Sequence, residues 1–196
     1  MKIGVLAVQG AFIEHEHIIE KIGHEVVEIR QRKDLDGIDG IILPGGESTV
    51  QGQLLRKLDM LATIKSLIAD GLPTLATCAG LILLAGHIDN DDSVHIGTLP
   101  VTVKRNAYGR QLGSFVRTAP MKGFDEFPMI FIRAPYISSI KDNVDVLAAV
   151  NDRIVAVQYN NQIGLAFHPE LSGDTRIHEY FICLLYTSPS PRDRSV

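Results

Sequence analysis

The sequence predicts an α/β fold, with a mostly parallel central sheet flanked by helices and an antiparallel β extension in the second half. Two observations carry this prediction. In the first half, short apolar runs typical of buried strands alternate with segments whose apolar residues recur at helical spacing. In the second half, short apolar runs follow one another with mostly turn residues between them. No repeat or linker interrupts the pattern, so residues 1–182 are expected to form one domain.

The first half divides into strands and helices in a regular order. Residues 2–8 form a continuous apolar run, which is typical of a strand buried on both faces. Residues 11–22 carry apolar side chains on a helical period that ends at Gly23. The other elements expected here are strands near 26–29, 38–43 and 74–77 and helices over 48–69 and 79–86.

The second half predicts short strands and one last helix. The strands are expected within residues 101–103, 115–116, 130–132, 146–150, 154–159 and 163–167, and the helix over 175–182. The dipeptides Asn151-Asp152 and Asn160-Asn161 separate the last three strands, and these residue types favour tight hairpin turns. We therefore expect these three strands to form an antiparallel meander.

The composition excludes several classes of protein. The formal net charge of −4 does not favour a nucleic-acid partner or an anionic membrane. No apolar stretch approaches the roughly 18 residues that a membrane-spanning helix needs. The chain has 2 cysteines without a spacing pattern, which favours a reducing compartment over a disulfide scaffold. The expected location is cytoplasmic.

Residues 183–196 are expected to be foreign to the protein. They place Ser188-Pro189-Ser190-Pro191 after a helical pattern, and proline excludes helix. The stretch from Cys183 to Asp193 resembles the translation of a sequencing-library adapter. An ordinary Ser/Pro-rich tail is the alternative. If the tail is foreign, Cys78 is the only native cysteine.

Cys78 is the first candidate for a catalytic residue. It follows an apolar strand and precedes Ala79-Gly80 and a helical pattern, which is the layout of a nucleophile elbow. Small residues permit the sharp turn, and a helix N-terminus behind the sulfur favours the thiolate. From the local sequence alone, a buried core cysteine is an equal alternative.

Phe167-His168-Pro169-Glu170 supplies candidates for the rest of a Cys-His-Glu triad. Residues two apart at the end of a strand point to one side, so Glu170 can accept a hydrogen bond from one imidazole nitrogen of His168. The other nitrogen can then act as a base toward the thiol. Taken alone, the tripeptide also fits a loop without chemistry.

The loop Pro44-Gly45-Gly46-Glu47-Ser48-Thr49 follows a buried strand and opens a helix, as anion-binding loops do. Its glycines let the backbone present an amide to a ligand, so the amides of Gly46 and Ala79 are candidates for an oxyanion hole. A P-loop is excluded because the Gly-Lys-Ser/Thr ending is absent. A plain glycine turn with Ser48 as N-cap is the alternative.

Two further groups of residues are weaker candidates. Arg105 and Arg133 lie at predicted strand ends and can bind a carboxylate, although an arginine in such a place is often only solvated. His15 and His17 do not share a helix face, so we expect no metal site there, and no cofactor is expected.

Four stretches in order resemble the glutaminase subunits of pyridoxal 5′-phosphate synthase, which are class I (triad) glutamine amidotransferases. The stretches are Ala7–Phe12 with Glu16-His17, Leu43–Thr49, Thr77–Gly80 and Phe167–Glu170. The resemblance runs from Met1 to about Ile182 and implies the flavodoxin-like class I glutaminase fold.

The resemblance implies hydrolysis of L-glutamine to glutamate and ammonia, with Cys78 as nucleophile and His168 and Glu170 completing the triad. Ammonia would pass to a separate (β/α)8 synthase subunit within a hetero-oligomeric complex. The residues implied to contact glutamine are Gly46, Glu47, Ser48, Arg105, Ile132 and Arg133. The resemblance also implies that docking of the synthase subunit organises the oxyanion hole, and a flip of the Gly45-Gly46 peptide is our hypothesis for that step.

Ala76 departs from the family pattern, which usually has glycine two residues before the nucleophile. A methyl group there either crowds the elbow or is harmless. Two other functions remain open at this point: a Cys-His-Glu hydrolase of the same fold that acts on γ-glutamyl substrates, and a non-catalytic binding subunit.

Overall fold

The structure is a computed structural model that describes residues 1–105 and 113–187. Within these ranges, ten strands form one sheet in the order β2-β1-β3-β4-β12-β11-β9-β6-β5, with β10 beside β11. Its parallel part is built from β1 (Lys2–Leu6), β2 (Glu25–Ile29), β3 (Gly40–Leu43), β4 (Thr74–Thr77) and β12 (Gln162–Leu165). All four pairings within this part are parallel, so the predicted parallel sheet is confirmed.

The remaining strands of the sheet form the predicted extension. They are β5 (Ala85–Ile88), β6 (Leu99–Lys104), β9 (Tyr136–Ile140), β10 (Asp145–Val150) and β11 (Arg153–Tyr159). Their pairings are antiparallel as predicted, except that β5 and β6 are parallel. The meander β10-β11-β12 is antiparallel throughout, as expected. Asn151, Asp152 and Asn160 at its turns have positive φ angles, a conformation that Asn and Asp tolerate better than most residues.

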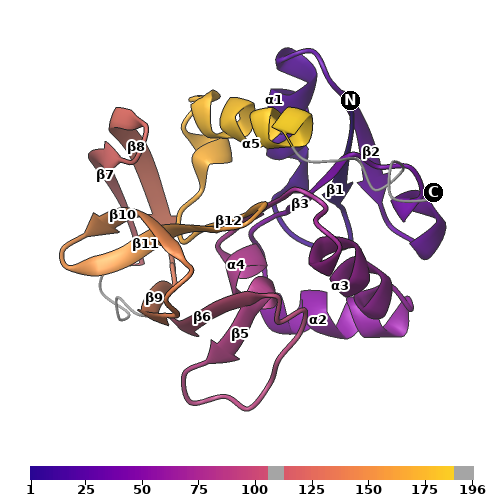
Figure 1. Cartoon of the computed structure of the whole chain (residues 1–196), viewed down its shortest axis with the longest axis horizontal. Coiled ribbons are helices and arrows are strands. Elements are labelled where there is room, and N and C mark those ends of the chain that lie inside the picture. The colour runs from indigo at the N-terminus through magenta and orange to yellow at the C-terminus, as the bar shows by residue number, and fades with distance from the viewer. Residues whose placement is uncertain (106–112, 188–196) are drawn as a thin grey trace.

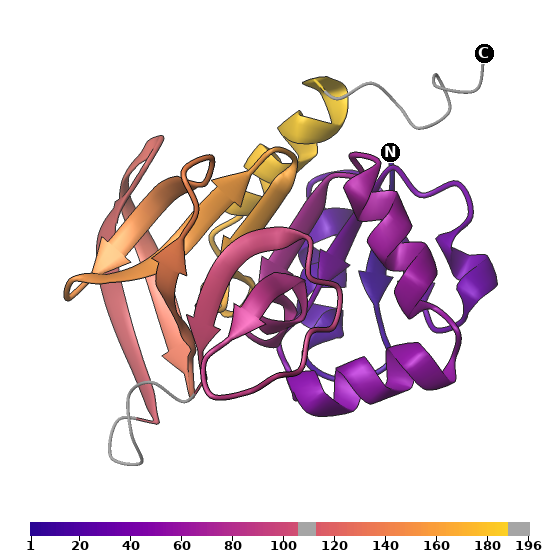
Figure 2. The same ribbon diagram turned by 60° about the horizontal axis from the view of Figure 1, so that its bottom comes forward.

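A separate antiparallel ribbon, β7 (Ser114–Met121) with β8 (Phe124–Ile132), lies at the end of the molecule far from β2 (Figures 1 and 2). Its carboxyl end reaches the parallel sheet, because the carbonyl of Ile130 accepts a hydrogen bond of 2.8 Å from the His168 N–H. The end of β8 and the segment after it therefore lie beside the residues that follow β12.

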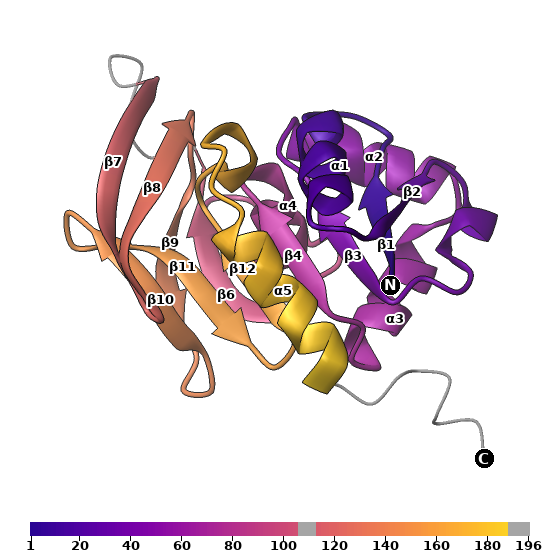
Figure 3. The ribbon, with the colours of Figure 1, turned by 90° about the horizontal axis from the view of Figure 1, so that it is seen from above.

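Helices cover both faces of the parallel sheet. Figures 1 and 3 show α1 (Phe12–Lys21) and α5 (Arg176–Thr187) on one face. The other face is covered by α2 (Ser48–Lys57), α3 (Leu61–Ala69) and α4 (Ala79–Leu84). Short 3₁₀ turns, η1 (Arg32–Leu35) and η2 (Pro169–Leu171), complete the described elements. None of the described helices is long and apolar enough to cross a membrane.

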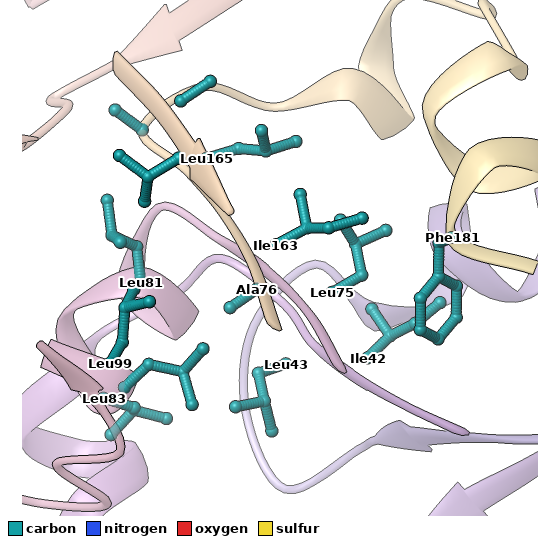
Figure 4. Close-up of a cluster of buried hydrophobic side chains, with 14 of the residues drawn as sticks. Ile42, Leu43, Leu75, Ala76, Leu81, Leu83, Leu99, Ile163, Leu165 and Phe181 are labelled. Carbon is teal, nitrogen blue, oxygen red and sulfur yellow. The ribbon is translucent and has the colours of Figure 1, made fainter. Parts of the chain in front are cut away.

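Ala76 lies in the core beneath the nucleophile turn. It is fully buried and pairs with Leu43 on one side and Gly164 on the other. Figure 4 shows it among the apolar side chains of β3, β4, β12 and α4. A Cβ built on Gly164 would lie 2.8 Å from Leu81 Cδ1, so this layer is tightly packed. The methyl group of Ala76 fills part of the layer.

The predicted helix over 48–69 is wrong as a single element. The chain turns at Asp59, whose φ of 55° is left-handed, and α3 begins only at Leu61. Leu58 belongs to the apolar stripe that suggested one helix, yet it is 38% exposed. Met60 is fully buried in its place. The turn carries no Gly or Pro, so the sequence offered no signal for it.

Other elements and boundaries also differ from the sequence prediction. The helix expected over 79–86 ends at Leu84, and β5 begins at the next residue. The strands β5 and β9 were not predicted at all. At the other end of the chain, α5 continues to Thr187, and Leu185 is buried against Gly40. Residues 188–196 of the tail expected to be foreign lie outside the described residues.

Candidate active site

A cavity of about 470 Å³ opens at the carboxyl ends of the parallel strands. Loops after β1, β3, β4 and β12 meet there, as expected for ligand sites in open α/β sheets. The residues lining it are Gln9, Ala11, Gly45, Gly46, Glu47, Ser48, Thr49, Cys78, Ala79, Ile82, Arg105, Ile132, Arg133, His168 and Leu171. Every site residue named from the sequence is in this group except Glu170, which lies behind His168.

Cys78 occupies a strained turn between β4 and α4. Its φ of 50° and ψ of −104° are unusual for any residue with a side chain, as expected for a nucleophile elbow. Its N–H donates a 2.8 Å hydrogen bond to the carbonyl of Leu165 on β12, which ties the turn to the adjacent strand. A Cβ on Gly80 would lie 2.1 Å from the Leu43 carbonyl oxygen, so the turn requires a glycine at this position.

His168 and Glu170 make the predicted contact, because His168 Nδ1 lies 2.6 Å from Glu170 Oε1. The geometry differs from the strand end assumed above. Pro169 starts the 3₁₀ turn η2, and that turn brings Glu170 back beneath the His168 ring. Both side chains are buried.

Burial alone would lower the pKa of His168. Hydrogen bonds to Cys78 and Glu170, together with the negative charges of these two groups, outweigh burial and raise the pKa to about 10. The imidazolium form is therefore stabilised next to the sulfur. A cysteine beside a proton-carrying imidazole that a carboxylate orients is the arrangement that nucleophilic acyl transfer requires.

Two glutamines, Gln9 and Gln51, hold the glycine loop by hydrogen bonds, and neither is among the site residues predicted from the sequence. Gln9 Oε1 accepts a 2.9 Å hydrogen bond from the N–H of Glu47. The buried amide of Gln51 donates to the carbonyls of Gln9 and Pro44. The sequence indicated a role only for the motif that contains Gln9. The contacts of Gln9 with Glu47 and of Gln51 with Gln9 join residues far apart in the chain, so no local pattern predicts them.

The Gly45-Gly46 peptide lies between the start of α1 and the ring of His168. Its carbonyl oxygen accepts a 3.0 Å hydrogen bond from the N–H of Ala11. In a trans peptide the N–H points opposite to the C=O, so the Gly46 N–H is directed away from Ala11. A Cβ on Gly45 would lie 2.3 Å from His168 Cε1, so the loop can approach the ring only because residue 45 is glycine.

Both arginines predicted from the sequence reach the cavity. Arg105 Nη1 lies 3.4 Å from an Asp91 carboxylate oxygen and 3.4 Å from Thr49 Oγ1. Arg133 has a left-handed φ of 43°, and its N–H donates to the Gly113 carbonyl. The neighbouring Ile132 carbonyl lies 4.0 Å from Cys78 Sγ. The second half of the chain thus supplies cationic groups to a wall of the cavity.

His15 and His17 lie on different sides of α1, as the sequence suggested, because His15 is fully buried and His17 is exposed. Across residues 1–105 and 113–187, no group of three or more His, Cys, Asp or Glu side chains is placed to hold a metal ion.

Comparisons with known proteins identify the family and agree with the fold. The model of the SNO glutamine amidotransferase family matches residues 5–186. The chain is 58% identical over 183 residues to pyridoxal 5′-phosphate synthase subunit PdxT of Desulfitobacterium hafniense, covering 93% of this chain and 92% of that protein. It is 52% identical over 186 residues to the Streptococcus pneumoniae protein of the same name, covering 93% of this chain and 96% of that protein.

A solved glutamine amidotransferase superposes with a TM-score of 0.90 at 38% identity, covering 94% of this chain and 98% of the other. Another glutamine amidotransferase, from Thermotoga maritima, superposes with a TM-score of 0.62 at 17% identity, covering 98% of this chain and 87% of the other. The second likeness supports the fold alone. The family match spans nearly the whole described chain and includes all four loops of the cavity, so this protein belongs to the SNO glutamine amidotransferase family.

Proposed function

We propose that this chain hydrolyses L-glutamine to glutamate and ammonia with Cys78, His168 and Glu170, and that it supplies the ammonia to pyridoxal 5′-phosphate synthesis. The observation that carries the proposal is geometric: Cys78 and His168 line one cavity, and Nδ1 of His168 lies 2.6 Å from Oε1 of Glu170. Hydrogen bonds and charges of Cys78 and Glu170 also raise the pKa of His168 against the effect of burial, which agrees with this arrangement. The PdxT name of the two relatives supports the biosynthetic role.

In the first step, the Cys78 thiolate attacks the side-chain amide carbon of glutamine, and the carbonyl π electrons move to oxygen. The amides of Gly46 and Ala79 stabilise this oxyanion. The tetrahedral intermediate then expels the amide nitrogen, which leaves as ammonia after taking the proton of the His168 imidazolium. A γ-glutamyl thioester remains on Cys78.

In the second step, His168 takes a proton from a water molecule, and the resulting hydroxide attacks the thioester carbon. Collapse of the second tetrahedral intermediate breaks the C–S bond and releases glutamate, which regenerates the thiolate–imidazolium pair. Glu170 accepts the Nδ1–H hydrogen bond throughout, so it fixes the ring orientation and stabilises the imidazolium.

The proposed glutamine contacts follow from charge. The α-carboxylate of glutamine is suited to Arg105 and Arg133, and the α-ammonium to the Glu47 carboxylate. Gly46, Ser48 and the Ile132 backbone complete the proposed set around the same cavity. The contact of Arg105 with Asp91 supports this role, because it restricts the guanidinium before substrate arrives.

The proposed partner is a separate (β/α)8 synthase subunit in a cytoplasmic hetero-oligomeric complex. Neither a nucleic acid nor a membrane is proposed, and the net charge of −4 agrees with that. We also keep the proposal that residues 1–182 are the native glutaminase domain and that residues 183–196 derive from an adapter. Sequencing the gene across codon 183 tests this proposal directly.

The functional test is glutamate release from L-glutamine with and without the cognate synthase subunit, for the wild type and Cys78→Ala. We expect the synthase subunit to increase turnover of the wild type, and we expect no turnover in Cys78→Ala. Turnover that persists in folded Cys78→Ala would overturn the assigned nucleophile. Faster hydrolysis of a γ-glutamyl peptide than of glutamine would instead favour a γ-glutamyl hydrolase.

A further inference from the structure

A second buried histidine lies directly behind the triad. His15 belongs to α1, is fully buried, and does not line the cavity. Its ring contacts three groups from other parts of the chain: Thr77 at the end of β4, Glu170 in η2 and His178 in α5. It therefore joins the elements that carry the nucleophile and the carboxylate.

The Nε2 side of His15 faces the triad. Nε2 lies 3.3 Å from Thr77 Oγ1 and 3.5 Å from Glu170 Oε2. This is the Glu170 oxygen that does not contact His168; it is buried and has no hydrogen-bond partner among the described residues, and His15 Nε2 approaches it at the outer limit of hydrogen-bond distance. A buried carboxylate oxygen can only accept, and leaving it without a donor is costly. The geometry therefore favours a proton on Nε2 of His15.

The Nδ1 side of His15 faces His178 on α5. Nδ1 lies 2.9 Å from Nε2 of His178, which is also fully buried. Burial lowers the pKa of His15 well below its ordinary value, with contributions from His178 and His168. Burial likewise lowers the pKa of His178, to about 4. Both rings are therefore neutral near pH 7.

A neutral imidazole has one donor and one acceptor nitrogen. If Nε2 of His15 donates toward Glu170, its Nδ1 must accept, so His178 must donate through Nε2. The hydrogen bonds then run in one direction, from His178 to His15 and from His15 to Glu170. Because His15 donates without a positive charge, the negative charge of Glu170 remains available to the His168 imidazolium.

We propose that His15 is a positioning residue for glutamine hydrolysis: its neutral Nε2–H form holds Oε2 of Glu170, keeping Oε1 on Nδ1 of His168, and His178 fixes that tautomer. The inference rests on the proposed function, since it gives His15 a role only if Glu170 orients the catalytic histidine. A role in packing alone is the alternative, and it predicts a loss of stability without a selective loss of turnover.

The kinetic test compares His15→Leu, His15→Gln and the control His17→Leu, each assayed with saturating synthase subunit. His15→Leu should lower kcat about 10- to 100-fold, the range that one hydrogen bond to a buried charge supplies. KM should change little, because His15 does not touch the cavity. The side-chain amide of Gln can donate from nearly the position of Nε2, so His15→Gln should recover most of kcat. His17, exposed two residues along α1, should be replaceable without loss.

Wild-type kcat in folded His15→Leu would overturn the inference, and so would equal losses of kcat in His15→Leu and His15→Gln. Cys78→Ala is measured in parallel to separate the two hypotheses. If Cys78→Ala retains turnover, the proposed function itself fails. If Cys78→Ala is inactive while His15→Leu keeps full kcat, only the role of His15 fails.

A measurement on the wild-type protein does not depend on any variant being active. In protein labelled with ¹⁵N-histidine, NMR distinguishes the two neutral tautomers, and the His15 signals are those missing from His15→Gln. We expect a protonated Nε2 and an unprotonated Nδ1 at pH 7. A protonated Nδ1 would mean that His15 donates to His178 instead, which would overturn the inference.

Discussion

Nδ1 of His168 and Oε1 of Glu170 lie 2.6 Å apart, although proline is the only residue between them in the chain. The carboxylate stabilises the protonated ring, and this is one of the contacts that raise the pKa of His168 to about 10. In the proposed mechanism, the ring therefore keeps the proton for the leaving ammonia well above neutral pH.

Glu170→Gln should lower the pH at which activity is lost on the alkaline side. The native imidazolium persists until the pH rises through its raised pKa, and removing the negative charge moves that pKa down toward the ordinary value of about 6.5. The profile of kcat/KM against pH, measured for wild type and variant, checks this. We expect a downward shift of at least about one pH unit, and an alkaline limb at the same pH in both proteins would contradict the assignment.

Gly45→Ala should impair catalysis by steric contact with His168. The new Cβ would lie 2.3 Å from Cε1 of a ring that Glu170 holds in place, so the loop or the ring must shift. A displacement of about 1 Å in an active site can cost about 100-fold in rate, and we expect kcat/KM to fall by this order. Gly113→Ala is the matched control, because a Cβ there meets nothing within 4 Å. Equal activity of both variants would show that the loop adapts without cost.

Ala76→Gly should test whether the departure from the family pattern matters. Ala76 is buried in a tightly packed layer, and strand interiors tolerate glycine poorly. We expect the free energy of unfolding to fall by about 1 to 2 kcal/mol, from the lost methyl burial and the added chain entropy. Urea unfolding measures this change, while kcat should stay the same. A variant with markedly higher kcat would show that the methyl group crowds the elbow.

Acid should destabilise the protein through its buried histidines. The folded-state pKa of His178 is lowered to about 4, so between pH 6.5 and pH 4 the unfolded chain binds a proton there that the folded chain does not. Stability is thus present above the unfolded pKa and declines as pH falls. Such a shift corresponds to about 3 kcal/mol. Urea unfolding at several pH values should give a shallower decline for His178→Gln, and parallel declines would contradict this account.

The sequence was sufficient to predict the parallel sheet and the cavity loops that follow β3, β4 and β12, because strand and helix periodicities and turn residues are local signals. It was not sufficient for the break after Leu58. The apolar stripe includes Leu58, but Leu58 is partly exposed in the structure. Met60 is buried instead, and the chain turns between the two residues. A local pattern cannot reveal such a tertiary preference.

The same limit applies to the support of the site. Gln9, Gln51 and His15 act through contacts with residues between 7 and 163 positions away along the chain, and only the folded structure shows most of these partners. The motif containing Gln9 and the cluster containing His15 were visible in the sequence. The structural roles of Gln9, Gln51 and His15 could not be predicted from the sequence, because Gln and His side chains fit surface positions equally well.

β4 and β12 are neighbours in the sheet, with Thr77 paired to Leu165, although the whole antiparallel extension lies between them in the chain. Cys78 and His168, the proposed nucleophile and base, are thus spaced by a register that does not depend on the length of the intervening segment. That segment contributes Arg105 and Arg133 to the cavity instead. Changes of length in the loops of this segment should therefore alter the cavity wall, while the spacing of Cys78 and His168 stays set by the pairing of β4 with β12.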